Sequence, residues 1–258
     1  MGQSPESHRM STSNSRSISL HLEELRQRII VSLIAIAAGV IISFVFADQL
    51  FDILIQPAGG IGLIFVEVTE MLSTYMQVCL IGGIILSMPV LVYELIAFVT
   101  PALTAQEKKY VWIILPFIIL MFAGGVLFGY FILIPPAMQF LLSFGADIAT
   151  PQIRIGNYIS LVSRLLLAIG LVFETPIITT FLARLGILSW RWLAKQWKWA
   201  FILAFVLGAL ITPTLDPVNQ TLVALPLIVL YLLSILLARI FVKHPSGAPE
   251  GTPLQDKT

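Results

Sequence analysis

The chain has 258 residues, of which 58% are hydrophobic and 11% are charged, and its mean hydropathy is +0.95. Soluble domains are about a quarter charged, so this composition excludes a soluble domain and predicts a polytopic membrane protein. The net charge of +1 is uninformative, because the position of each charge matters more than the sum in such a protein. The single cysteine, Cys79, lies in an apolar run and cannot form an internal disulfide.

The amino-terminal part of the chain divides into a polar tail and a short amphipathic segment. Residues 1–18 are rich in serine and have no apolar run, which predicts a disordered tail. After this tail, Leu22, Leu25 and Ile29 recur at the spacing of one helical face. Segment 19–28 therefore predicts a short amphipathic helix that lies at the membrane surface and then turns into a membrane span.

The charged residues of this segment indicate its location and a class of ligand. Arg26 and Arg28 precede the first apolar run, and basic residues beside a span favour the cytoplasmic side. Glu23 and Glu24 place carboxylates at the boundary between water and lipid, where a cation can reach them. Glu24 and Arg28 are also four residues apart, the spacing of an ordinary helical ion pair, so spacing alone does not assign Glu24 a binding role.

Six apolar segments follow, and they predict six membrane-spanning helices. They cover about residues 29–46, 72–99, 111–134, 158–182, 200–211 and 222–240. The fifth is short, so we expect the fifth and sixth to form a tight hairpin. Of the 15 lysines and arginines, only Arg154 and Arg164 lie away from the segments assigned to the inner side, so both termini are expected in the cytoplasm. The chain is thus divided into a membrane domain, residues 19–242, and a flexible tail, residues 243–258.

Prolines within these segments predict bends and ends of helices. Pro89 is expected to kink the second span, because a proline removes one helical hydrogen bond. Pro135 and Pro136 are expected to end the third span. Pro176 lies inside the fourth.

Several chemistries have no counterpart in the sequence. There is no phosphate-binding loop of the form GxxxxGK[ST], no HExxH motif and no cluster of histidine and cysteine. None of the three histidines lies in a predicted span, so an intramembrane serine hydrolase would lack its base. We therefore expect no enzyme activity, no catalytic residue, no metal and no cofactor.

Segment 184–199 combines basic side chains with tryptophans. The basic residues are Arg184, Arg191, Lys195 and Lys198, and the tryptophans are Trp190, Trp192, Trp197 and Trp199. This pattern is typical of the inner membrane interface. We therefore expect the segment to contact the lipid bilayer and not a nucleic acid.

Glu174 is a carboxylate deep within the fourth apolar segment. Such a group costs roughly 2.5–3.5 kcal/mol on insertion scales, so it is expected to face a cavity, a partner or the bundle interior. It has either a functional role or the role of a protonated acid with one interhelical hydrogen bond. With the proline-broken spans, it also leaves open a proton-coupled small-molecule secondary transporter, although the two halves show no internal repeat. A purely structural scaffold is a further alternative to a transporter.

Short motifs along the chain resemble those of one known family. They are HLEELR at 21–26, YELIAF at 93–98 with TPAL at 100–103, FETP at 173–176, and Asp216 before QTLVALP at 220–226. In this order they resemble the TatC family, the multispan receptor subunit of the twin-arginine protein translocase. The resemblance extends from about residue 20 to residue 242. It implies an all-α, glove-like concave bundle of six transmembrane helices.

The resemblance also implies a function and partners. TatC-like proteins bind signal peptides that carry two consecutive arginines on folded cargo. They then recruit single-span subunits of the TatA and TatB type, which are expected to dock near the fifth and sixth spans, and export is driven by the proton-motive force. A homo-oligomer within the complex is expected. The implied location is the cytoplasmic (inner) membrane of a prokaryote rather than a thylakoid membrane.

Particular residues match the inner site of the family. Glu24 and Glu107 match the two acids that form the twin-arginine contact, and Phe98 and Pro101 match residues of the same inner region. Arg26 matches the arginine of the first motif, for which a structural or orienting role is implied. The chemistry agrees, since guanidinium binds carboxylate through two parallel hydrogen bonds and an ammonium does not.

Further residues match other parts of the family pattern. Glu174 matches an intramembrane glutamate that lines the concave face, Asp216 an acid at the outer hairpin, and Pro57 a proline of the first outer loop. One departure is Glu94, which stands where a glutamine is expected. It lies near the inner end of its span, and its carboxylate can extend to the cytoplasmic surface. The charge of the inner site therefore differs from the family pattern.

Overall fold

The fold is described from a computed structural model, which covers residues 6–59, 62–99, 105–144, 152–212 and 216–241, with the side chains of 6–21, 99, 105–111 and 113 left out. The helices are α1 (Glu6–Val45), α2 (Ala47–Ile55), α3 (Glu70–Val99), α4 (Ala105–Phe128), α5 (Ile134–Ser143), α6 (Ile155–Phe173), α7 (Thr175–Arg184), α8 (Trp190–Lys195), α9 (Trp197–Ile211) and α10 (Pro217–Phe241). The shorter elements are the 3-10 helix η1 (Gln56–Ala58), the π-helix η3 (Gly129–Leu133) and the strands β1 (Leu63–Ile64) and β2 (Ile153–Arg154).

The lengths of the apolar helices agree with the predicted spans. Within the described residues, five stretches are long and apolar enough to cross a membrane, namely Leu22–Val45, Glu70–Phe98, Ile114–Ser143, Ile155–Arg184 and Pro217–Phe241. The sixth apolar helix, α9, has 15 residues and rises about 22 Å, which is less than the ~30 Å of hydrocarbon. The prediction of a polytopic all-α membrane protein with a short fifth apolar helix is confirmed.

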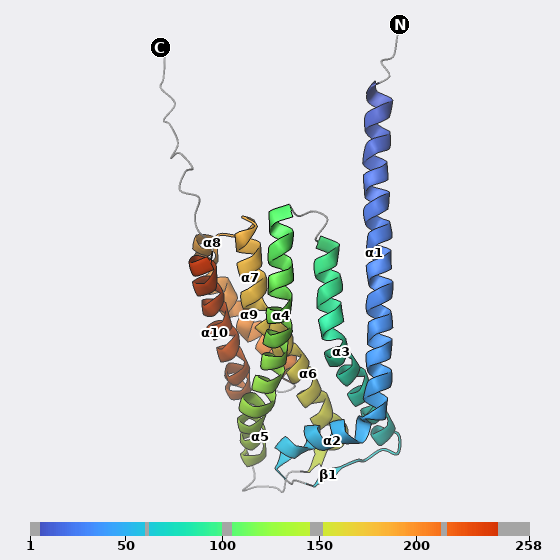
Figure 1. The fold of residues 1–258 in the computed structure, drawn as a ribbon. Helices are drawn as coiled ribbons and strands as arrows, with labels where there is room; N and C mark the ends of the chain where they lie inside the picture. Colours follow the sequence, from blue (N-terminus) through green and yellow to red (C-terminus); the bar gives the residue numbers. More distant parts are fainter. Residues whose placement is uncertain (1–5, 60–61, 100–104, 145–151, 213–215, 242–258) are drawn as a thin grey trace.

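The two ends of the bundle are distinct (Figure 1). Helix α1 begins, and helices α3, α7 and α10 end, on one side of the molecule, which we call the inner side. Helix α2 and strand β1 lie on the opposite side, which we call the outer side. This arrangement agrees with the expectation that both termini face the same compartment. The assignment of the inner side to the cytoplasm rests on the distribution of lysine and arginine.

The first helix differs from the prediction. Helix α1 runs without interruption from Glu6 to Val45, so segment 19–28 continues directly into the first span and does not turn at the membrane surface. The reason is that the sequence has no proline or glycine between Glu6 and Gly39, so nothing interrupts the helical hydrogen bonds. The division of the chain at residue 18 stays a prediction.

The expected ends of two spans also need correction or refinement. Pro135 and Pro136 do not end the third span, because they lie in the first turn of α5, and α5 continues to Ser143. The π-helix η3 precedes them, and proline is tolerated in the first turn of a helix. The fourth span is divided into α6 and α7 at Glu174, two residues before Pro176. Pro89 lies inside α3, as expected, and the helix changes direction along its length in Figure 1.

Helices α1 and α3 pack at a contact between two glycines. A Cβ atom built on Gly39 would lie 2.5 Å from the carbonyl oxygen of Gly83, which is closer than any real Cβ contact. Small residues let helix backbones approach in this way within membranes. The contact fixes the position of α1 relative to α3, and therefore of the charged residues at their inner ends.

Substitution of Gly39 tests this packing. We expect Gly39→Ala to destabilise the protein by about 1–3 kcal/mol, because the added methyl group meets backbone and not a movable side chain. The measurement is thermal unfolding of the purified protein in detergent. Gly124→Ala in α4 is the matched control, since a Cβ there meets nothing within 4 Å. Equal unfolding temperatures for the two variants would contradict the described packing.

Helix α6 forms the centre of the bundle. Its residues Tyr158, Ile159, Val162 and Ile169 are at most 2% exposed. The hydroxyl group of Tyr158 donates a hydrogen bond to the carbonyl oxygen of Leu54 at 2.8 Å, which ties α6 to α2 on the outer side. Strands β1 and β2 pair in parallel there, with Leu63 opposite Ile153 and Ile64 opposite Arg154.

Candidate functional site

The start of the membrane-spanning part of α1 (Leu22–Val45) and the inner end of α3 bring three charged side chains together. Arg28 of α1 lies between Glu24 of the same helix and Glu94 of α3. Its Nη1 atom donates a hydrogen bond to Oε2 of Glu94 at 2.9 Å. Its Nη2 atom is 3.7 Å from Oε1 of Glu24, which is an ion pair without a good hydrogen bond. The expected helical pair of Glu24 and Arg28 is present, but the stronger contact of Arg28 is with Glu94.

The three side chains differ in exposure. The side chain of Glu94 is 8% exposed, whereas those of Glu24 and Arg28 are 27% and 31% exposed. The position of Glu94 near a helix end suggested that its carboxylate extends to the surface. In the structure it is instead buried against Arg28. A buried carboxylate needs a partner more than an exposed one does, because desolvation penalises its charge. Glu24 is thus the more accessible carboxylate of the cluster.

The structure describes some, but not all, of the other residues that were predicted for the inner site. Arg26 is exposed and pairs with Glu23, with 3.6 Å between Nη1 and Oε1. Phe98 lies four residues after Glu94 on α3 and is half-buried. Pro101 lies outside the described residues. Glu107 belongs to the first turn of α4, but its side chain is outside the described part. Its approach to Glu24 therefore stays a prediction.

Glu174 lies at the junction of α6 and α7 and lines a cavity. Its residue is 4% exposed, and neither carboxylate oxygen has a hydrogen-bond partner among the residues that the structure describes. The cavity has a volume of about 360 Å³. Its walls come from α3, α4, α6 and α7, and include Met88, Val92, Ile114, Ile118 and Leu171. Of the two earlier interpretations, a cavity is present, whereas neither oxygen makes an interhelical hydrogen bond of good geometry with the described residues, although the backbone of Phe122 on α4 is close enough to interact with the carboxyl group.

An ion cluster on the outer side was not foreseen from the sequence. Arg154 contacts two acids, with 3.0 Å between Nη2 and Oε2 of Glu70 and 3.2 Å to Oε1 of Glu67. Hydrogen bonds to Glu70, and then to Glu67, raise the pKa of the Arg154 guanidinium above its ordinary value. Glu70 also accepts the backbone N–H groups of Val66 and Gly156 at 2.9 and 3.2 Å.

The charge pattern of the sequence contains a signal for this ion cluster. Arg154 is one of only two basic residues predicted to lie away from the inner segments, and the charged residues of the first outer loop are all acids. The pairing itself depends on the contact of β1 with β2, which neither strand reveals because each has two residues. The cluster joins the first outer loop to the start of α6. Pro57, also predicted on this side, lies in η1 and is half-buried.

Asp216 has a local structural role at the outer hairpin. It directly precedes α10, which begins with Pro217, and its Oδ1 atom accepts the backbone N–H of Asn219 at 2.7 Å. This is the geometry of a helix N-cap, which aspartate favours. Its Oδ2 atom also accepts the Nδ2 group of Asn219 at 3.1 Å. Gln220 of α10 donates to the carbonyl oxygen of Phe205 at 2.9 Å and so connects α10 to α9.

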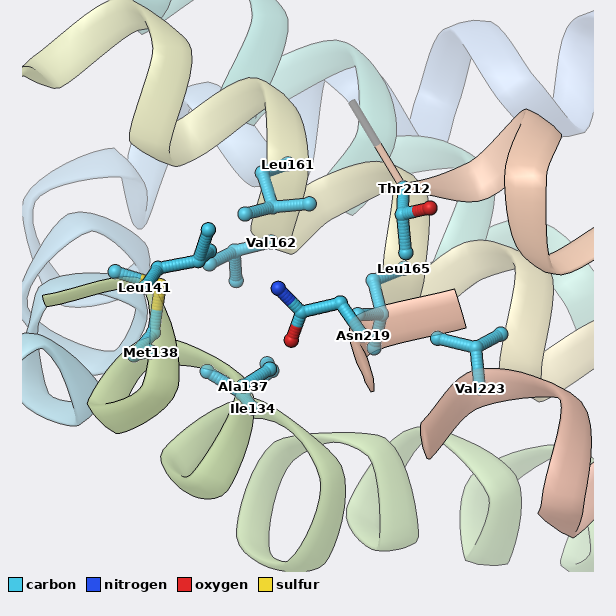
Figure 2. Close-up of a pocket in the computed structure, with 10 residues that line it drawn as sticks. All are labelled: Ile134, Ala137, Met138, Leu141, Leu161, Val162, Leu165, Thr212, Asn219 and Val223. Atoms are coloured by element: carbon cyan, nitrogen blue, oxygen red, sulfur yellow. The ribbon is translucent and has the colours of Figure 1, made fainter. Parts of the chain in front are cut away.

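The side chain of Asn219 points into a small apolar pocket (Figure 2). The pocket has a volume of about 10 Å³, which is about the space of one water molecule. The labelled neighbours come from α5, α6, the end of α9 and α10, and include Ala137, Met138, Val162, Leu165 and Val223. Oδ1 of Asn219 has no hydrogen-bond partner in the described part of the chain. The pocket is too small for a ligand other than water.

Comparisons with known proteins agree with this architecture. A family model described as Sec-independent protein translocase protein (TatC) matches residues 20–226. A protein of that name from Carboxydothermus hydrogenoformans is 41% identical, over 86% of this chain and 92% of the relative. One from Desulforapulum autotrophicum is 42% identical, over 89% of this chain and 87% of the relative.

Two solved structures are also similar. The crystal structure of a twin arginine translocase receptor, TatC, has a TM-score of 0.78 and 39% sequence identity, over 86% of this chain and 99% of that chain. A second, of the receptor in DDM, has a TM-score of 0.79 and 40% identity, over 84% of this chain and 99% of that chain.

The fold and these matches define a polytopic membrane subunit of a protein-export machinery. It is neither an enzyme nor a small-molecule transporter. The chain belongs to the TatC family, whose members are core subunits of the twin-arginine translocase. It works in a membrane together with other subunits of that translocase.

Proposed function

We propose that this chain is the receptor that binds the twin-arginine signal peptides of folded cargo on its inner side. The observation that carries the proposal is the carboxylate of Glu24. It is accessible, lies at the inner end of a span, and is only loosely held by Arg28 at 3.7 Å. An acid in this position can accept the guanidinium group of a ligand without first losing a strong internal hydrogen bond.

Two carboxylates explain selectivity for two arginines. We propose Glu107 as the second acid, Phe98 and Pro101 as further residues of the site, and Arg26 as an orienting residue. Arginine presents a planar fork of donors that fits a carboxylate, whereas lysine presents a compact ammonium group with a stronger hydration shell. A site of this kind discriminates between arginine and lysine through geometry, although both carry the same charge.

Photo-cross-linking in membranes tests the proposal. A signal peptide with consecutive arginines is expected to label the chain strongly, and the same peptide with two lysines weakly. The labelled segments should include the start of the span in α1, around Glu24, and the inner end of α3. Equal labelling by both peptides would overturn the receptor assignment.

The docking of other subunits is proposed from the same family pattern. Single-span partners of the TatA and TatB type would dock near α9 and α10, and copies of this chain would associate in the complex. On α9, Leu203, Val206 and Leu210 form an exposed apolar stripe at helical spacing. This stripe supports a lipid-facing or helix-facing surface. The location proposed is the cytoplasmic membrane of a prokaryote, with transport driven by the proton-motive force.

A further inference from the structure

The guanidinium group of Arg28 is shared unequally between two carboxylates. It donates a hydrogen bond of 2.9 Å to Glu94 and lies 3.7 Å from Glu24. The unequal distances matter because Arg28 and Glu24 are one helical turn apart on α1, where a close ion pair forms readily. Contact with α3 therefore draws the guanidinium away from its neighbour on the same helix.

The charges of the cluster have a consequence for binding. Two carboxylates and one guanidinium leave a formal charge of −1. Because the buried partner, Glu94, holds the guanidinium, the uncompensated charge falls on the more accessible acid, Glu24. A neutral side chain in place of Glu94 would leave Arg28 and Glu24 to neutralise each other.

We propose that Glu94 is a positioning residue that holds Arg28 in the closer of its two contacts, loosens the pair of Arg28 with Glu24, and thereby leaves Glu24 available to bind a ligand guanidinium. This proposal rests on the receptor function proposed above and adds a specific determinant of its affinity. Arg28 is the internal competitor for the site, and Glu94 determines how closely Arg28 pairs with Glu24. The contact of Gly39 with Gly83 supports this positioning role of Glu94, because it fixes α1 against α3.

The experiment measures the affinity of an arginine-pair signal peptide for the full chain in lipid nanodiscs. Glu94→Gln keeps the shape of the side chain and removes its charge, and we expect affinity to fall about tenfold, the effect of losing one charged hydrogen bond. Arg28→Gln combined with Glu94→Gln removes the competitor as well, and we expect affinity to return to within about threefold of wild type. Glu94→Asp keeps the charge and should also stay within about threefold.

These variants separate positioning from simple packing. If Glu94 only packed, the isosteric Glu94→Gln would be milder than the shortened Glu94→Asp, and the double variant would be no better than Glu94→Gln. Either result would overturn the proposal, as would wild-type affinity in Glu94→Gln. If Glu94→Gln folds poorly, the double variant still decides, because it contains no unpaired charge at these two positions. Failure of wild type to prefer arginine over lysine would instead overturn the receptor function itself.

Discussion

Glu24→Gln is expected to weaken binding of an arginine-pair signal peptide at least tenfold. The substitution keeps the size and hydrogen-bonding ability of the side chain but removes the charge that a guanidinium group requires. A hydrogen bond to a charged group contributes about 1.5–3 kcal/mol, which corresponds to a loss of roughly 10- to 100-fold. Fluorescence titration of a labelled peptide against the protein in nanodiscs measures the affinity.

Glu23→Gln is the matched control for this prediction. Glu23 precedes Glu24 directly, carries the same charge and pairs with Arg26 on the exposed surface. Its side chain is 73% exposed, so its interactions are screened by solvent. We expect the Glu23 variant to bind within about twofold of wild type. A similar loss in both variants would mean that net charge, and not a specific contact, attracts the peptide.

Glu174→Leu is expected to stabilise the protein and to abolish export. The carboxyl group is buried without a hydrogen-bond partner in the described part of the chain and lines an apolar cavity. Its replacement by an apolar side chain removes the cost of burying a polar group, about 1–3 kcal/mol on mutational scales. We expect the acid to act in transport, so the gain in stability is accompanied by a loss of export, as is common when a destabilising functional residue is replaced.

Two measurements on the same variant check this prediction. The thermal unfolding temperature in detergent should rise, and transport of a folded cargo into inverted membrane vesicles should fall at least tenfold. Glu174→Gln serves as the control, since it keeps polarity at the cavity but cannot ionise. Export at the wild-type level in Glu174→Leu would assign Glu174 no function in transport.

The fold was predictable from the sequence because the lipid environment imposes simple rules. Apolar length indicated the apolar spans, whereas the orientation, which follows from the distribution of lysine and arginine, stays a prediction. The helix ends were less predictable. Pro135 and Pro136 are compatible with the first turn of α5, so the residues that were expected to end a helix instead lie within a longer one. Helix α1 lacks a breaker before Gly39, and periodicity alone cannot reveal whether a surface helix turns into its span.

The candidate site was predictable in its residue types but not in its pairings. Glu24 and Glu174 were both identified as acids in unusual positions, and the structure gives each an environment consistent with a function. The contact of Arg28 with Glu94 joins residues that are 66 positions apart, and that of Arg154 with Glu70 joins residues 84 apart. Local spacing suggested only the pair of Glu24 with Arg28. Long-range pairings depend on how helices pack, as at Gly39 and Gly83, and no local pattern encodes them.

A double-mutant cycle between the signal peptide and Glu24 tests the receptor account most directly. Four affinities are measured in nanodiscs, for the arginine-pair and lysine-pair peptides with wild type and with Glu24→Gln. If Glu24 contacts the peptide arginines, each single change weakens binding, and both together weaken it little further than either alone. Additive losses, or an undiminished preference for arginine in the Glu24 variant, would contradict the account.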